Sequence, residues 1–91
     1  MAQLHVELVS VESKVWSGEA DMLVARTTDG ELGVLPGHAP LLGQLADPAL
    51  VRIKNGGQET AFTVNGGFLS ITEQGVSVLA ETAEPADPAA R

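Results

Sequence analysis

The side chains that most often carry out chemistry are few in this sequence, and they lie far apart. There are two histidines, His5 and His38, and no cysteine, so a thiolate zinc site cannot form. No acid lies at a metal-ligand spacing from His38, the serines lack a base partner, and the acids are spread along turns and strand edges. The sequence therefore predicts no catalytic residue, no metal site and no cofactor, and it disfavours an enzyme.

The glycine pair Gly66-Gly67 is the feature closest to a phosphate-binding loop. Such a loop needs a helix N-terminus behind the glycines and a lysine or serine after them. Here the apolar residues Phe68 and Leu69 follow directly, and no helix is expected. We therefore predict a turn at this pair, without bound phosphate.

Lys54 precedes a turn at Asn55-Gly56, which leaves open a carrier module with a lipoylated or biotinylated lysine. The flanking residues Ile53 and Asn55 resemble neither the lipoyl nor the biotinyl attachment sequence. The favoured interpretation is a solvent-facing lysine near a strand end, and a mass measurement distinguishes the two.

The composition excludes several classes of partner. The formal net charge is −7, from 12 acids against 5 bases, so phosphate backbones and anionic lipid head groups are repelled. We expect no nucleic-acid binding and no direct lipid binding. Apolar residues make up 44% of the 91 residues, but no apolar run approaches the roughly 18 residues that span a bilayer. The first residues also lack the basic flank and apolar stretch of a signal peptide, which predicts a cytoplasmic location.

Apolar and polar residues alternate with period two along most of the chain. In residues 3–9 this places Leu4, Val6 and Leu8 toward a core. Trp16, the only tryptophan, is expected to fill the same core. Similar strand patterns occupy residues 14–16, 22–27, 50–54, 60–64, 68–71 and 76–79.

No stretch of ten or more residues has the apolar spacing of an amphipathic helix. Because every strand has one apolar face, the sheet should be antiparallel and folded on itself around one core. The sequence therefore predicts an all-β domain at residues 1–84, either an antiparallel sandwich or a flattened barrel, with no long helix. Residues 85–91 contain Pro85 and Pro88 and are expected to form a flexible C-terminal tail.

Residues 29–42 do not fit an ordinary strand and hairpin. Two prolines and three glycines force an irregular path, yet the segment carries five large aliphatic side chains. Some of these side chains should pack inward. A loop this apolar at one end of a small sandwich is also a place for a partner to bind.

The run GELGVLPGHAPLL at residues 30–42 closely resembles the signature of ATP synthase epsilon subunits. Further similarity lies in residues 16–18, 64–71 and 76–83, so the resemblance covers roughly residues 3 to 84. It implies a β-sandwich of about ten short strands that packs one face on the gamma subunit and rests its lower end on the polar loops of the c-ring.

The resemblance also implies a function, which is mechanical. Proton flow turns the ring, the ring turns gamma and epsilon together, and other subunits in the catalytic head make ATP. The chain would then be a non-catalytic rotor subunit, held peripherally at the cytoplasmic face of the cell membrane. The family's usual C-terminal helix pair is missing before Arg91, so neither auto-inhibition nor ATP sensing is expected. A naturally short subunit and a shortened one both fit.

Residue by residue, the resemblance places Glu31 at the c-ring contact and His38 beside it, at the interface with the stalk. From the residues alone, Glu31 would instead be a solvated acid in a turn, and His38 a loop histidine held by a backbone hydrogen bond. The resemblance assigns the surrounding apolar contact surface to Leu35, Pro36, Gly37, Leu41 and Leu42.

Overall fold

The computed structural model describes residues 3–86 and contains eight strands in that range. Their bounds are β1 Leu4–Ser10, β2 Lys14–Ala20, β3 Met22–Thr27, β4 Gly30–Val34, β5 Leu41–Gln44, β6 Ala49–Asn55, β7 Gln58–Thr72 and β8 Gly75–Ala86. The same residues include no helix, and therefore none that could cross a membrane. The all-β fold without a long helix is thus confirmed.

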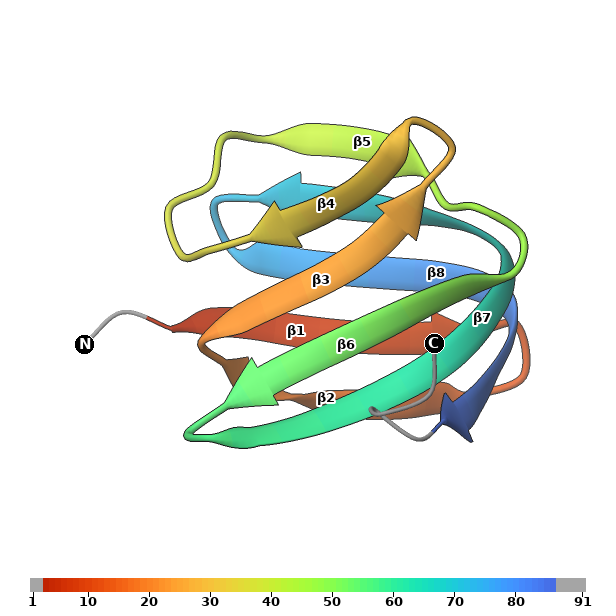
Figure 1. Cartoon of the computed structure of the whole chain (residues 1–91), viewed down its shortest axis with the longest axis horizontal. Helices are drawn as coiled ribbons and strands as arrows, with labels where there is room; N and C mark the ends of the chain where they lie inside the picture. The colour runs from red at the N-terminus through yellow and green to blue at the C-terminus, as the bar shows by residue number, and fades with distance from the viewer. Residues whose placement is uncertain (1–2, 87–91) are drawn as a thin grey trace.

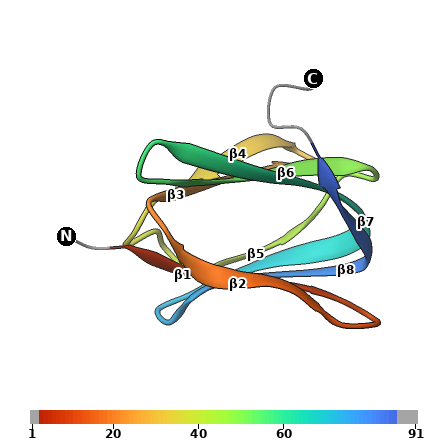
Figure 2. The same cartoon turned by 90° about the horizontal axis from the view of Figure 1, so that it is seen from below.

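The strands form one sheet that folds over into a sandwich (Figure 1). Its order is β2-β1-β8-β7-β6-β3-β4, and β5 pairs with β7 beside this path. One layer contains β1, β2, β5 and β8, and the other contains β3, β4 and β6 (Figure 2). The long strand β7 belongs to both layers, because its first half pairs with β6 and its second half with β5.

All strand pairs are antiparallel except β1 with β8, which are parallel. A parallel pair needs a long connection, and here the whole intervening chain supplies it. Local alternation carries no information about this pairing of the two ends of the domain.

The core confirms the faces that alternation predicted. Leu4, Val6 and Leu8 are buried, and Trp16 is partly buried against the same cluster. No polar or charged residue among those described is buried. The interior is therefore closed by aliphatic packing, with one phenylalanine, Phe62, in the cluster.

The predicted turn at Gly66-Gly67 is wrong. The strands predicted at residues 60–64 and 68–71 are one strand, β7, which pairs with β8 both at Asn65 and at Gly67. Gly66 has a φ of 62°, so β7 changes direction there without leaving the ladder. A Cβ at Gly67 would collide with the carbonyl oxygen of Leu79. The pair thus allows one strand to pass from one layer to the other. Residues 3–86 contain eight strands where the resemblance implied about ten, and the merging of two expected strands into β7 accounts for one of that difference.

Replacing Gly67 by alanine is expected to lower the free energy of unfolding by about 1–3 kcal/mol, because the added methyl group meets backbone that cannot move freely. Gly43→Ala is the matched control, since a Cβ at Gly43 meets only Thr27 at an ordinary 3.9 Å. Urea unfolding of both variants measures the difference. Equal stability of the two would contradict the steric role of Gly67.

Strand β8 extends two residues beyond the predicted end of the domain. Pro85 pairs with Phe62, and Ala86 pairs with Ala61. Strand β1 pairs β8 only as far as Ala80, so Pro85 sits where β8 has a single neighbouring strand, and such an edge position tolerates proline. The rest of the expected tail, residues 87–91, lies outside the described residues.

Asp21 ties together three segments that are distant in the sequence. Its carboxylate accepts a hydrogen bond from the Gln3 side chain at 3.0 Å and another from the Gly56 backbone N–H at 2.9 Å. These two bonds, the first being the larger cause, hold the pKa of Asp21 below its usual value. The β2–β3 junction and the β6–β7 hairpin are thereby held next to the start of β1.

Candidate functional site

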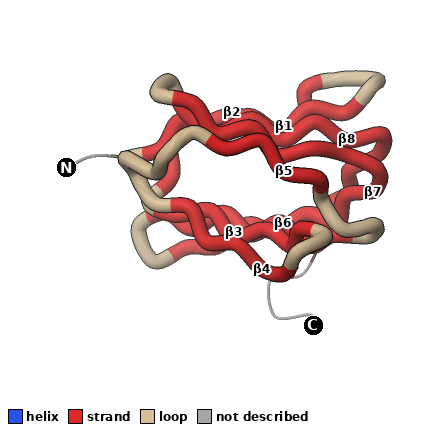
Figure 3. Tube along the Cα trace, turned by 90° about the horizontal axis from the view of Figure 1, so that it is seen from above, coloured by secondary structure: helices blue, strands red, loops and turns tan. Residues whose placement is uncertain are grey.

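The segment with the epsilon-like signature forms one edge of the sandwich, made of β4, residues 35–40 and β5 (top of Figure 1). Strand β4 ends the strand order and β5 pairs only with β7, so both are edge strands. Figure 3 looks onto this edge, with β4 in one layer and β5 in the other. A cavity of about 240 Å³ lies between them, lined by Leu32, Leu41 and Leu42 among others.

The structure does not place His38 beside Glu31. Glu31 is the second residue of β4, whereas His38 lies in the loop beyond the strand's other end. At about 3.3 Å per residue, the strand separates the two backbones by roughly 10 Å or more. The His38 backbone N–H donates to the Leu35 carbonyl at 3.1 Å, and the His38 Nδ1 donates to the Ala39 carbonyl at 2.7 Å. His38 is thus held by backbone hydrogen bonds, as the residues alone suggested.

The apolar residues of the predicted surface lie along this edge, and the leucines are exposed. Leu42 is 71% exposed and Leu35 is 56% exposed, while Leu41 is less so. Gly37 has a φ of 85°, which the tight turn after Pro36 requires. Exposed leucines at an open sheet edge are costly unless a partner covers them.

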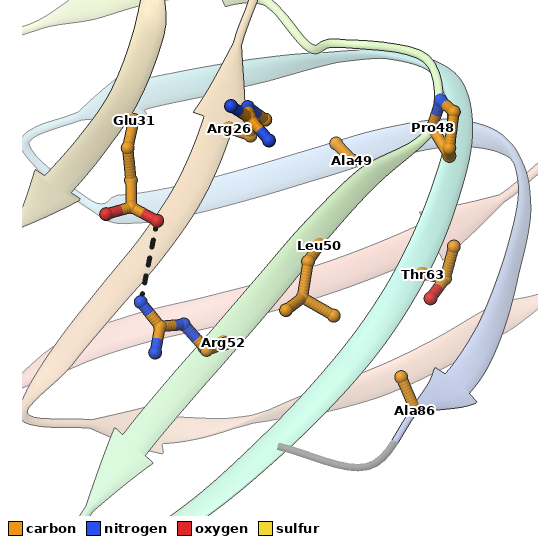
Figure 4. A pocket seen from close by; sticks show the side chains of 8 residues that line it. All are labelled: Arg26, Glu31, Pro48, Ala49, Leu50, Arg52, Thr63 and Ala86. Atoms are coloured by element: carbon orange, nitrogen blue, oxygen red, sulfur yellow. Dashed lines mark ion pairs between the residues drawn. The ribbon is translucent and has the colours of Figure 1, made fainter. Parts of the chain in front are cut away.

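Glu31 has an ion-pair partner that the sequence analysis missed. Its carboxylate lies 3.5 Å from a guanidinium nitrogen of Arg52 on β6 (Figure 4). Arg52 also lies 3.8 Å from Glu59. The Glu31 side chain is 67% exposed, but that of Arg52 is only 15% exposed. Alternation within residues 50–54 could have indicated that Arg52 faces outward, although not that it meets Glu31.

A second exposed surface was also missed: the apolar patch formed by Val9, Val11, Phe68 and Leu79. The sheet register aligns Val9 with Leu79 and Leu79 with Phe68 across β1, β8 and β7. Phe68 is 51% exposed and Leu79 is 53% exposed, and they line a hollow of about 210 Å³ with both valines. The consecutive apolar pairs at residues 68–69 and 78–79 break the alternation. Each pair puts one apolar side chain on the outer face, and this could have indicated the patch from the sequence.

His5 lies on the exposed face of the same layer, between two acids. Its Nδ1 is 2.8 Å from Glu19 and its Nε2 is 3.3 Å from Glu7. These hydrogen bonds, the one to Glu19 being stronger, raise the pKa of His5 from its usual 6.5. The acids approach opposite ring nitrogens, so the three groups do not converge on one point. Across residues 3–86, no cluster of three or more histidines and acids is placed to hold a metal ion.

Comparison with known proteins identifies the family. The family model of the ATP synthase delta/epsilon chain β-sandwich domain matches residues 3–86. The ATP synthase epsilon chain of Frankia casuarinae is 64% identical over 81 residues, which cover 89% of this chain and 95% of the relative. That of Mycobacterium tuberculosis is 54% identical over 85 residues, which cover 92% of this chain and 70% of the relative.

Two solved structures share the fold. A chain of the Euglena gracilis mitochondrial ATP synthase, in a structure of its OSCP/F1/c-ring, superposes with a TM-score of 0.86 at 26% identity. The match covers 93% of this chain and 54% of that one. A chain from the central stalk and c-ring of the Tetrahymena thermophila enzyme has a TM-score of 0.75 at 14% identity, covering 90% of this chain and 66% of that one, and supports the fold alone. The chain therefore belongs to the ATP synthase epsilon chain family, as a subunit that is not itself catalytic.

Proposed function

We propose that the chain is a central-stalk subunit of a proton-translocating F-type ATP synthase, where it links the gamma subunit to the c-ring and couples ring rotation to ATP synthesis. It would act at the cytoplasmic face of the cell membrane as a peripheral part of the complex. One observation carries this proposal: a single packed sandwich presents two exposed apolar surfaces, the β4–β5 edge and the apolar patch, which adjoin at Leu42. A body that joins two partners needs two such surfaces.

The apolar patch fits the gamma subunit. A permanent interface buries apolar area over a broad surface and has few charges at its centre. Phe68 and Leu79 supply that area on the outer face of one layer, and Leu42 on β5 extends it toward the edge of the sandwich, because Leu42 pairs with Ser70 on the same face as Phe68.

The β4–β5 edge fits the polar loops of the c-ring. Glu31 provides an exposed carboxylate that can accept hydrogen bonds from a basic or amide group of a ring loop. Leu35, Pro36, Gly37 and His38 lie in the loop beyond the far end of β4, and Leu41 and Leu42 begin β5. The proposed contact therefore extends along an edge instead of centring on one point.

The packed core explains how such a joint can transmit rotation. The edge and the patch are connected through strands β5, β7 and β8, which share a continuous hydrogen-bonded ladder. A close-packed interior deforms little under load. The proposed role needs no movement within residues 3–86, and no inhibition of hydrolysis is assigned to them.

Reconstitution tests the proposal. The tagged chain is expected to co-purify with gamma, and membranes rebuilt without the chain should lose proton-driven ATP synthesis because ring and head are no longer joined. ATP hydrolysis by the detached head, with and without the chain, serves as the control and should change by less than about twofold, or roughly 0.4 kcal/mol in barrier height. Unchanged synthesis without the chain would refute the coupling role.

A further inference from the structure

A third surface of the domain lies on the opposite layer from the apolar patch. There a cavity of about 630 Å³ opens on the outer face of β3 and β6 and reaches the end of β8 at Ala86 (Figure 4). Its lining includes Leu50, Ala49 and Thr63 together with two arginines, Arg26 and Arg52. Glu31 of the β4–β5 edge also lines the cavity, whereas the apolar patch lies on the other layer.

The basic residues of this acidic chain are concentrated on that face. Of the four lysines and arginines in the described range, only Lys14 belongs to the other layer. Arg52 and Lys54 are two apart on β6 and share a face, and Arg26 joins them because Val24, two residues before it, pairs with Arg52. The register puts the acids Glu31, Glu59 and Glu84 on the same face, so cations and acids are equal in number there, in a chain of net charge −7.

The two arginines differ in how their charges are balanced. The Arg52 side chain is 15% exposed and lies within 4 Å of both Glu31 and Glu59, at 3.5 and 3.8 Å. Arg26 is exposed, and no acid in residues 3–86 approaches it within ion-pair distance. Glu31 is its cross-strand neighbour, yet the Glu31 carboxylate contacts Arg52 instead. Among residues 3–86, Arg26 is therefore a cation at the mouth of the cavity without an ion-pair partner.

We propose that this cavity binds the carboxylate side chain of an acidic residue in a protein partner, through the Arg26 guanidinium. A guanidinium donates two parallel hydrogen bonds to a carboxylate, which matches its planar shape. The neighbouring Glu31 and Glu59 repel a doubly charged phosphate more strongly than a single carboxylate. The outward-facing Leu50 can receive an apolar residue next to the acid, so the bound segment is an Asp or Glu flanked by aliphatic side chains.

The proposal does not rest on the proposed function, because its test uses the isolated chain and a peptide, although Glu31 of the β4–β5 edge also lines the cavity. The probe is the capped tripeptide acetyl-Leu-Glu-Leu-amide, with acetyl-Leu-Gln-Leu-amide as its uncharged match. Both are titrated into the isotope-labelled full chain while the NMR signals of the arginine Nε–H groups and of the β6 backbone are followed. The glutamyl peptide is expected to move the signals of Arg26 and Leu50 and to bind about tenfold more tightly than the glutaminyl peptide.

Substitutions assign the effect to Arg26. Arg26→Gln is expected to reduce binding of the glutamyl peptide to the level of the glutaminyl one, and Arg26→Lys should restore part of the loss, since it keeps the charge without the planar fork. Lys14→Gln makes the same change of charge on the other layer and should leave binding unchanged. The backbone spectrum of each variant confirms that it is folded.

Four results would overturn the proposal. They are equal binding of the two peptides, signal changes confined to the other layer, a loss in Lys14→Gln as large as in Arg26→Gln, and tighter binding of inorganic phosphate than of the glutamyl peptide at the same signals. The last result would assign the cavity to phosphate groups instead of carboxylates.

Discussion

Replacing Phe68 and Leu79 by aspartate is expected to weaken binding of the chain to gamma by at least about 100-fold. Each side chain, once buried in an interface, contributes about 1.5–3 kcal/mol, and two aspartates must in addition lose their water. Both residues are about half exposed in the free chain and belong to no buried cluster. The fold should therefore survive the change.

The measurement is calorimetric titration of gamma with each variant, alongside urea unfolding of the chain alone. The control carries Gln58→Asp and Gln74→Asp, which add the same two charges at exposed hairpin positions outside the apolar patch. The control should bind like the unmodified chain. If both doubly charged variants bind equally well, gamma contacts another face of the sandwich.

Glu31→Lys is expected to uncouple the complex while the chain remains folded. The substitution removes the proposed acceptor for the ring loop and places a third cation next to Arg26 and Arg52. The affinity of the chain for the ring should fall by about tenfold or more, because a hydrogen bond to the Glu31 carboxylate is replaced by repulsion between a lysine and a basic group of the ring loop. The free energy of unfolding should change by no more than about 1 kcal/mol, since the pair with Arg52 is largely solvent-exposed at Glu31.

Proton-driven ATP synthesis and co-purification with the ring measure this effect in the assembled complex. Glu12→Lys is the matched control, because Glu12 is an exposed acid between β1 and β2, far from the β4–β5 edge in the fold. A normal synthesis rate in Glu31→Lys would remove Glu31 from the proposed contact. Loss of the folded state would instead make Glu31 a structural residue.

The sequence alone determined the class of fold and most of the strand faces. The alternation of Leu4, Val6 and Leu8 predicts their burial because successive side chains in a strand point to opposite faces, whatever the strand pairs with. The glycines and prolines of residues 29–42 likewise predict an irregular apolar segment, and that segment forms the β4–β5 edge. Rules of this kind depend only on neighbouring residues.

The candidate surfaces depended on which strands pair, and only the tertiary structure decided that. The local sequence at Gly66 and Gly67 resembles a hairpin turn. The residues before and after the bend both pair with β8, however, so the two glycines form a bend within β7. Glu31 and His38 are seven positions apart in the sequence, and β4 separates them, because Glu31 lies near its start and His38 in the loop beyond its end.

The apolar patch and the arginine cavity have the same origin. Val9, Phe68 and Leu79 form one surface because β1 pairs with β8 and β8 with β7, and Arg52 meets Glu31 because β6 lies next to β3 and its hairpin partner β4. Successive side chains of a strand alternate between its two faces, so the pattern of apolar residues in the sequence shows which face each side chain takes. The register between distant strands decides which side chains share that face, and it follows from packing the whole core at once.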